Sequence, residues 1–158
     1  MPCVPYAWQP IGTALALPSF KSKRLNVLGF LSKDGRAFFR HAEGPVDTGR
    51  VAAAFDAFAA QRAAEYAVHG RPCVVNLDNA SWHTSRAFRE REGVWADCGV
   101  VVHYLPPYSP ELNAIETLWR KIKYEWLPLD CYASYSTMKS AVLDILDGLG
   151  SKYHICFV

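Results

Sequence analysis

Apolar positions first mark a pair of strands early in the chain. Residues 24–31 are strand-like, and residues 36–41 supply a returning strand. Asp34 and Gly35 lie between them, and this dipeptide is a strong hairpin signal because both residues tolerate the backbone angles of tight turns. Residues 1–20 contain four prolines and no clear period, so they predict an irregular or extended lead-in.

A long helix is predicted next. Asp47 or Thr48 is suited to cap its start, and Gly70 is suited to end it. Alanine fills most of the segment, which favours helix. The positions that recur at helical spacing are Val51, Phe55, Phe58, Arg62 and Tyr66. We interpret this face as core packing.

Two short apolar runs predict buried strands at residues 72–77 and 100–104. Thr84 is suited to cap a short helix that runs through Arg91 between them. The order strand, helix, strand predicts that the two strands are parallel, because crossovers of this kind join parallel neighbours in a sheet.

The last third of the chain predicts two further helices. Asn113 and Glu116 have capping-box spacing at the start of the first helix, and Pro128 ends it. Its apolar face is expected at Leu112, Ile115, Trp119, Ile122 and Trp126. Ser134 or Ser136 opens the second helix. Its inward positions are expected at Met138, Val142, Ile145 and Leu149, and its end near Gly148 and Gly150. The elements together predict an α/β fold, a mixed sheet flanked by helices, in one domain spanning residues 1–158.

Composition narrows the class of protein. The chain has 158 residues, of which 51% are hydrophobic and 13% aromatic, so it is globular rather than disordered. It has no run of 18 apolar residues and no secretory signal pattern. We therefore expect no membrane span, and we expect a cytoplasmic location. Its five cysteines include no C-x-x-C pair, which argues against a zinc knuckle and favours free thiols.

Two acidic residues carry the candidate chemistry. Asp78 follows a predicted strand, where α/β sheets bind ligands, although an aspartate before asparagine also caps turns. Glu116 lies in the first turn of a predicted helix, after a loop braced by prolines, although it also fits a capping box. Two Mg²⁺ ions held by such carboxylates can activate a nucleophile and stabilise the leaving oxygen during phosphodiester cleavage.

Basic and aromatic residues lie close to both acids in sequence. The net charge of only +2 does not identify a nucleic-acid binder, but a polyanion approaching the acids would meet these side chains. His83 is expected either to contact the site or a phosphate, or to be a packed, hydrogen-bonded histidine. The residues expected to contact DNA are His83, Arg86, Tyr108, Arg120 and Lys123, with Tyr108 suited to stack on a base. Each basic cluster alone is also typical of a solvated helix face.

At these residues the sequence resembles the catalytic domain of mariner-type and related bacterial insertion-sequence transposases, the DDE endonuclease superfamily. The resemblance rests on Leu77-Asp-Asn-Ala-Ser-Trp-His83 and on Pro106-Pro-Tyr-Ser-Pro-Glu-Leu-Asn-Ala-Ile-Glu-Thr-Leu-Trp119. Ala114 stands where proline is usual in the family. The resemblance implies a ribonuclease H-like fold, with Asp78 as the second and Glu116 as the third acid of the triad. It also implies Mg²⁺ or Mn²⁺, double-stranded DNA as substrate, and joining of a freed 3′-hydroxyl to target DNA.

One departure from the family pattern concerns the first acid, which belongs on the first, central strand. The first acidic residue here is Asp34, in the predicted hairpin turn. We therefore expect a transposase fragment without its helix-turn-helix region, whose first strand is missing or replaced and whose isolated form binds metal weakly and cleaves DNA little or not at all. The empty sheet position would be filled by residues 1–20, by a swapped strand, or by a second copy, which predicts a homodimer.

Three alternatives stay open. The chain could be a noncatalytic module that binds DNA or dimerises with a full-length transposase and regulates it; metal-dependent cleavage distinguishes the two. It could be another ribonuclease H-like nuclease acting on RNA or junctions, which the Asn-x-Ile-Glu-x-x-Trp motif argues against. Both acids could be structural caps only. No membrane and no small-molecule cofactor is expected, and the partner is expected to be the DNA of a bacterial nucleoid.

Overall fold

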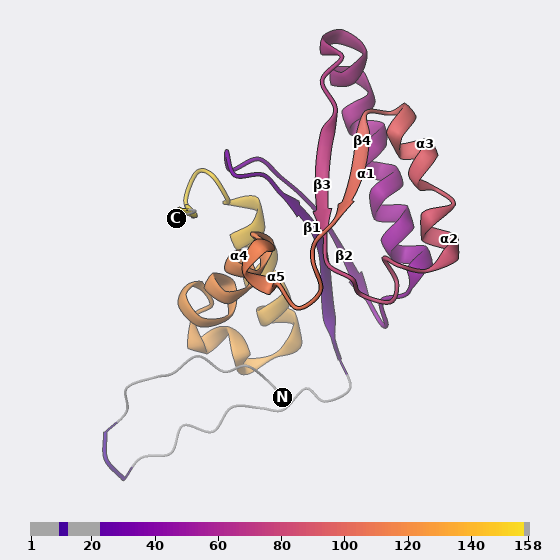
Figure 1. Cartoon of the computed structure of the whole chain (residues 1–158). Coiled ribbons are helices and arrows are strands. Elements are labelled where there is room, and N and C mark those ends of the chain that lie inside the picture. The colour runs from indigo at the N-terminus through magenta and orange to yellow at the C-terminus, as the bar shows by residue number, and fades with distance from the viewer. Residues whose placement is uncertain (1–9, 13–22, 157–158) are drawn as a thin grey trace. The chain divides into compact units, whose positions relative to one another are not determined.

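The computed structural model describes residues 10–12 and 23–156, and these divide into two compact units (Figure 1). The first unit described below comprises Asn26–Phe30 and Phe38–Asn113. The second comprises, of the described residues, Leu31–Ala37, those from Ala114 onward and those that precede Asn26. The predicted lead-in lies outside the described residues except for Pro10, Ile11 and Gly12.

The predicted hairpin is confirmed. Strands β1 (Leu25–Leu31) and β2 (Ala37–Glu43) form a two-stranded sheet. In the turn, the Ser32 amide donates to the Arg36 carbonyl at 2.8 Å, and Gly35 adopts a φ of 86° that an L side chain rarely adopts. Hydrogen bonds from Ser32 and then Arg36 hold the pKa of the Asp34 carboxyl below its usual value.

The long helix α1 (Thr48–His69) begins and ends at the predicted residues. The carboxylate of Asp47, rather than Thr48, accepts from the Arg50 amide at 2.8 Å. At the other end, Gly70 has a φ of 62° and its amide donates to the Tyr66 carbonyl at 2.7 Å. Three alanines, one valine and one phenylalanine form the buried face: Val51, Ala52, Ala54, Phe55 and Ala59.

Strands β3 (Cys73–Leu77) and β4 (Val100–Tyr104) are parallel, as predicted, and their register pairs Cys73 with Val100 and Leu77 with Tyr104. In Figure 1, α1 and two short helices lie together on one side of these strands. Side chains alternate between the two faces of the strand pair, so Leu77 and Val100 are buried. Because β3 and β4 are parallel, the carboxyl ends of both strands meet at the same edge of the sheet.

The connection from β3 to β4 differs from the prediction. Ser85, not Thr84, caps α2 (Arg86–Arg89): its hydroxyl accepts from the Phe88 amide at 3.3 Å. The Thr84 hydroxyl instead donates to the Ala80 carbonyl, because Thr84 belongs to the turn that follows β3. A second helix, α3 (Glu92–Asp97), was not predicted as a separate element.

The core of this unit is an aromatic cluster. Phe55 of α1 lies with its ring centroid 5.0 Å from that of Phe88, 4.7 Å from that of Trp95 and 4.7 Å from that of Phe30. Phe88 and Trp95 are almost fully buried, at 0% and 1% exposure. Contacts of this kind join β1, α1 and the α2–α3 segment through one side chain.

One polar group reinforces that junction. The Oδ1 atom of Asp56 on α1 accepts from the Trp95 Nε1 at 2.8 Å and from the Arg91 Nη2 at 2.7 Å. The buried indole N–H is thereby satisfied.

The chain is α/β, as predicted, but the described strands do not form one mixed sheet. They form two sheets of two strands, β1–β2 and β3–β4. Phe30 from β1 and Leu77 from β3 both pack in the core built around α1. The helix is therefore the element that unites the two sheets, and no described strand joins them by hydrogen bonds.

The second unit contains α4 (Ile115–Lys121), a π turn (Ile122–Trp126), a 3-10 turn (Leu129–Ala133) and α5 (Tyr135–Asp147). Ser134 caps α5, with a capping box to Thr137 that the sequence did not indicate. The buried residues of α5 are Val142, Ile145 and Leu146.

The capping box predicted for Asn113 and Glu116 is wrong. Helix α4 has Ala114 as its N-terminal flanking residue, with no side-chain capping bond. Ala114 already has helical angles, φ −56° and ψ −27°, so the extended backbone that a capping box needs is absent. Leu112, expected on the apolar face, is 53% exposed, whereas Leu118 is fully buried. Within the described residues, no helix is long and apolar enough to cross a membrane.

Candidate active site

Asp78 lies directly after the last residue of β3, at the edge where the carboxyl ends of β3 and β4 meet. Its side chain is 53% exposed. One carboxylate oxygen, Oδ1, accepts from the Ala80 amide at 3.2 Å and lies 2.8 Å from the His83 Nδ1. The turn-capping role considered for Asp78 is therefore present, and it occupies only one of the two oxygens.

His83 lies in the turn that follows Asp78, and its side chain is only 16% exposed. Its amide donates to the Ala80 carbonyl at 2.9 Å, and its ring centroid lies 5.7 Å from that of Phe88. The ring is thus packed and hydrogen-bonded. Contact of His83 with DNA stays a prediction.

Tyr104, the last residue of β4, holds this turn in place. Its hydroxyl lies 2.9 Å from the His83 carbonyl oxygen and 2.6 Å from the Glu92 Oε1, and both are acceptors. Burial, followed by the neighbouring Glu92 carboxylate, raises the pKa of Tyr104 to about 12. The phenol therefore stays protonated at neutral pH and can donate. The Arg89 guanidinium lies 5.5 Å from the centre of the tyrosine ring.

A second contact ties the loops after β3 and β4 together. The Asn79 side-chain amide donates to the Leu105 carbonyl at 2.7 Å. Sequence reasoning missed the roles of Asn79 and Tyr104. The signal that could have found them is their position, because each lies at the carboxyl end of one of two strands predicted to be parallel.

Glu116 lies in the first turn of α4 in the second unit, and its side chain is exposed. Its carboxylate takes part in no helix cap, and it forms no hydrogen bond or ion pair with any of the described residues. Arg120 and Lys123 are also exposed and follow Glu116 at steps of four and three residues, so α4 and the π turn carry all three on one side. π turns often occur at functional sites.

The structure therefore places the two acids in separate units, Asp78 after β3 and Glu116 on α4. Their convergence stays a prediction. Within the described residues, no three His, Cys, Asp or Glu side chains gather as ligands for a metal ion. The donor chemistry fits Mg²⁺ or Mn²⁺, because both groups are exposed carboxylates and Mg²⁺ is usually bound by one or two carboxylates with water completing its shell.

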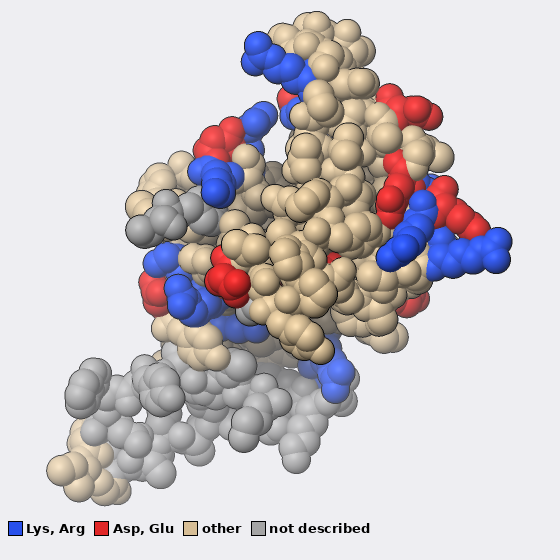
Figure 2. Space-filling view, viewed as in Figure 1, with Lys and Arg blue, Asp and Glu red and all other residues tan. Residues whose placement is uncertain are grey.

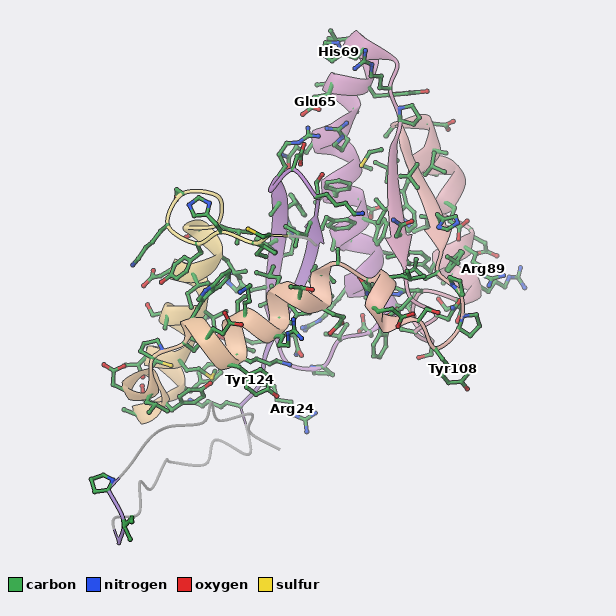
Figure 3. The ribbon with its side chains drawn as sticks, turned by 60° about the vertical axis from the view of Figure 1, so that its left-hand side comes forward. Arg24, Glu65, His69, Arg89, Tyr108 and Tyr124 are labelled. Atoms are coloured by element: carbon green, nitrogen blue, oxygen red, sulfur yellow. The ribbon has the colours of Figure 1, made fainter. Side chains whose placement is uncertain are left out.

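The remaining residues expected to contact DNA are solvent-exposed. The Arg86 side chain is 92% exposed, and its ion pair with Glu90, 2.7 Å from the Arg86 Nε to the Glu90 Oε1, costs little to break. Tyr108 is fully exposed with a φ of 59°, and Figure 3 shows its ring and the Arg89 side chain projecting away from the ribbon. Over α2 and α3, Figure 2 shows basic and acidic side chains next to each other rather than a field of one sign.

A family model described as DDE superfamily endonuclease matches residues 1–139. The chain belongs to the DDE superfamily endonuclease family. The DDE endonuclease chain is similar to the uncharacterised protein y4pE/y4sA of Sinorhizobium fredii (strain NBRC 101917 / NGR234), with 30% identity over 66 residues. That match covers 42% of this chain and 44% of the relative. The chain therefore matches less than half of the relative's length. Family membership suggests a transposase-like function.

Proposed function

We propose that this DDE endonuclease chain is the catalytic region of a DNA transposase, with Asp78 and Glu116 as the carboxylate ligands of divalent cations. Such cations, when bound, polarise the scissile phosphate and favour loss of a proton from the attacking oxygen. The residues of the chain orient their carboxylates and contact the DNA. The proposal includes a ribonuclease H-like fold and assembly as a homodimer on double-stranded DNA.

The observation that carries the proposal is the environment of Asp78. The carboxylate lies at the carboxyl end of a parallel strand, where α/β sheets bind ligands. Its Oδ1 is held by two hydrogen bonds, whereas its Oδ2 is bonded to none of the described residues. One oxygen is thus fixed by the protein, and the other is available to a hard cation.

Glu116 supports the proposal from the second unit. Its carboxylate lies at the start of a helix with Arg120 and Lys123 along the same side. Cationic side chains beside an acid allow a phosphate backbone to approach a site that would otherwise repel it. Arg86 and Tyr108 would add a phosphate contact and a stacked base in the first unit.

Calorimetric titration of Mn²⁺ into the purified chain tests the metal site. We expect weak binding to the unmodified chain and, in Asp78→Asn and Glu116→Gln, a loss of about tenfold or more in affinity, as for removal of a carboxylate from a site with few protein ligands. Asp97→Asn is the matched control, because Asp97 is an exposed acid at the end of α3. Equal affinities in Asp78→Asn and the control would contradict the proposal.

Cleavage of supercoiled plasmid in Mn²⁺ is the second readout. Little or no cleavage by the isolated chain is expected, because the first acidic residue of the chain, Asp34, lies in the β1–β2 turn and is a poor substitute for an acid on a central strand. Strong cleavage that survives Asp78→Asn would show that the active site lies elsewhere. Binding of DNA without any Mn²⁺ binding would favour the noncatalytic module.

A further inference from the structure

The contact between Asp78 and His83 has a definite direction. The carboxylate of Asp78 can only accept, so the proton in the 2.8 Å contact must belong to the Nδ1 of His83. The same nitrogen lies 3.3 Å from the Asp78 carbonyl oxygen, which is also only an acceptor. Both neighbours therefore select the form of the imidazole that carries hydrogen on Nδ1.

The imidazole is itself held by groups from other elements. The Tyr104 hydroxyl donates to the His83 carbonyl from the end of β4, and the His83 amide is fixed by the Ala80 carbonyl. The ring packs beside Phe88, which is fully buried in the core. A side chain with 16% exposure and bonds on both backbone groups has little freedom to turn away.

We propose that His83 is a positioning residue for Asp78: its Nδ1–H locks Oδ1 and so presents Oδ2 of the same carboxylate toward the cation and phosphate. The inference rests on the proposed function, because it assigns a role within that site. Without that bond, only the 3.2 Å hydrogen bond from the Ala80 amide would hold the carboxylate, whose side chain is 53% exposed. Hydrogen bonds of this kind to carboxylate ligands commonly influence metal affinity.

The position of the imidazole proton is the first measurement. Long-range ¹H–¹⁵N spectra of the whole chain, recorded above about pH 8 where a free imidazole is neutral, report which ring nitrogen carries hydrogen. The signal that disappears in His83→Asn identifies His83 among the five histidines. We expect hydrogen on Nδ1 in the unmodified chain and a shift toward Nε2 in Asp78→Ala. Hydrogen on Nε2 in the unmodified chain would overturn the inference whether or not the chain binds metal.

Mn²⁺ affinity is the second measurement, with a rescue variant. The side-chain nitrogen of asparagine occupies nearly the position of Nδ1, so we expect His83→Asn to stay within about threefold of the unmodified chain, and His83→Ala to lose about 10–100-fold. His103→Ala is the matched control, because His103 on β4 also bonds to a neighbouring side chain, with its Nδ1 3.0 Å from the Asn76 Oδ1. Thermal unfolding of each variant separates a lost fold from a lost contact.

The outcomes distinguish this inference from the proposed function. If Asp78→Asn abolishes Mn²⁺ binding and His83→Ala leaves it unchanged, the metal site stands and the positioning role of His83 falls. If Asp78→Asn has the same Mn²⁺ affinity as the unmodified chain, the proposed function falls. The measurement of which ring nitrogen carries hydrogen then decides alone whether His83 orients Asp78. A loss in His83→Ala that His83→Asn does not rescue would indicate packing rather than positioning.

Discussion

Tyr104 is a single residue at which burial and charge act in the same direction. Burial and the Glu92 carboxylate both disfavour the phenolate, and together they raise the pKa of the phenol to about 12 from an ordinary value of 10.0. Because the folded state binds this proton more tightly than the unfolded state, Tyr104 contributes stability that is complete below pH 10 and is lost as the pH rises toward 12.

We expect Tyr104→Phe to lower the free energy of unfolding at pH 8 by about 1–2 kcal/mol, because the His83 carbonyl and the Glu92 carboxylate lose the single phenolic hydrogen that they share. Between pH 10 and 12, the difference between the two proteins should shrink, since the variant has no phenol to titrate at this position. Urea unfolding at several pH values measures both effects. A difference that stays constant up to pH 12 would contradict the assigned role.

The chemistry at Asp78 could be predicted at the residue scale, but its partners could not. The sequence places Asp78 after an apolar strand, and the structure confirms that strand and its end. The Asp78–His83 contact is local enough to have been considered, whereas the Tyr104–His83 bond joins residues 21 positions apart. It depends on the β3–β4 register, which a single sequence does not determine.

Helix ends show, at the scale of an element, which local signals suffice. Asp47 caps α1 as predicted because the extended backbone before Thr48 allows its carboxylate to reach the Arg50 amide. Asn113 has a suitable side chain too, but Ala114 after it is already helical. Residue type predicts a cap only where the preceding loop leaves the backbone extended.

The close approach of β4 to α1 depends on one glycine. Gly99 has a φ of 80°, and a Cβ there would lie 2.3 Å from the Cγ of Tyr66. Gly70 also has a positive φ, of 62°, but a Cβ there would meet nothing within 4 Å. The two glycines share the backbone requirement and differ in the steric one.

We expect Gly99→Ala to lower the free energy of unfolding by about 2–5 kcal/mol, the sum of left-handed backbone strain and overpacking against Tyr66. Gly70→Ala should cost about 1–2 kcal/mol, because only the backbone strain applies. Urea denaturation of both variants gives the comparison. Equal losses would mean that the Tyr66 ring moves aside without cost.

The whole molecule consists of two compact units that carry one candidate acid each. Sequence reasoning predicted most elements, because helical and strand periods are local. It did not predict that the described strands form two separate sheets, and it placed Leu112 rather than Leu118 in the core. Pairing and packing between distant segments decide both features, and a local period contains no information on them.

DNA binding gives a prediction at this scale. Replacing Arg120 and Lys123 together by glutamine should reduce the slope of log affinity against log salt by about 2, since each phosphate contact contributes about 0.9 to that slope. Fluorescence anisotropy with a labelled duplex at several salt concentrations measures it.

Lys33→Gln with Lys152→Gln is the control, because both side chains are exposed in the same unit and the pair removes the same charge. An identical change of slope in the control pair would indicate nonspecific attraction and would remove Arg120 and Lys123 from the DNA interface.

The Asp56 carboxylate also bears on the order in which the first unit folds. Helices α2 and α3 have four and six residues, too few to persist alone in water. They are stabilised by Phe88 and Trp95 in the core and by Asp56, whose partners Arg91 and Trp95 lie 35 and 39 positions later. We therefore expect α1 to form first and the turn that joins β3 to α2 to become ordered afterwards. The carboxylate of Asp78 would then gain its orientation late in folding, and the same turn would open first when the unit is destabilised.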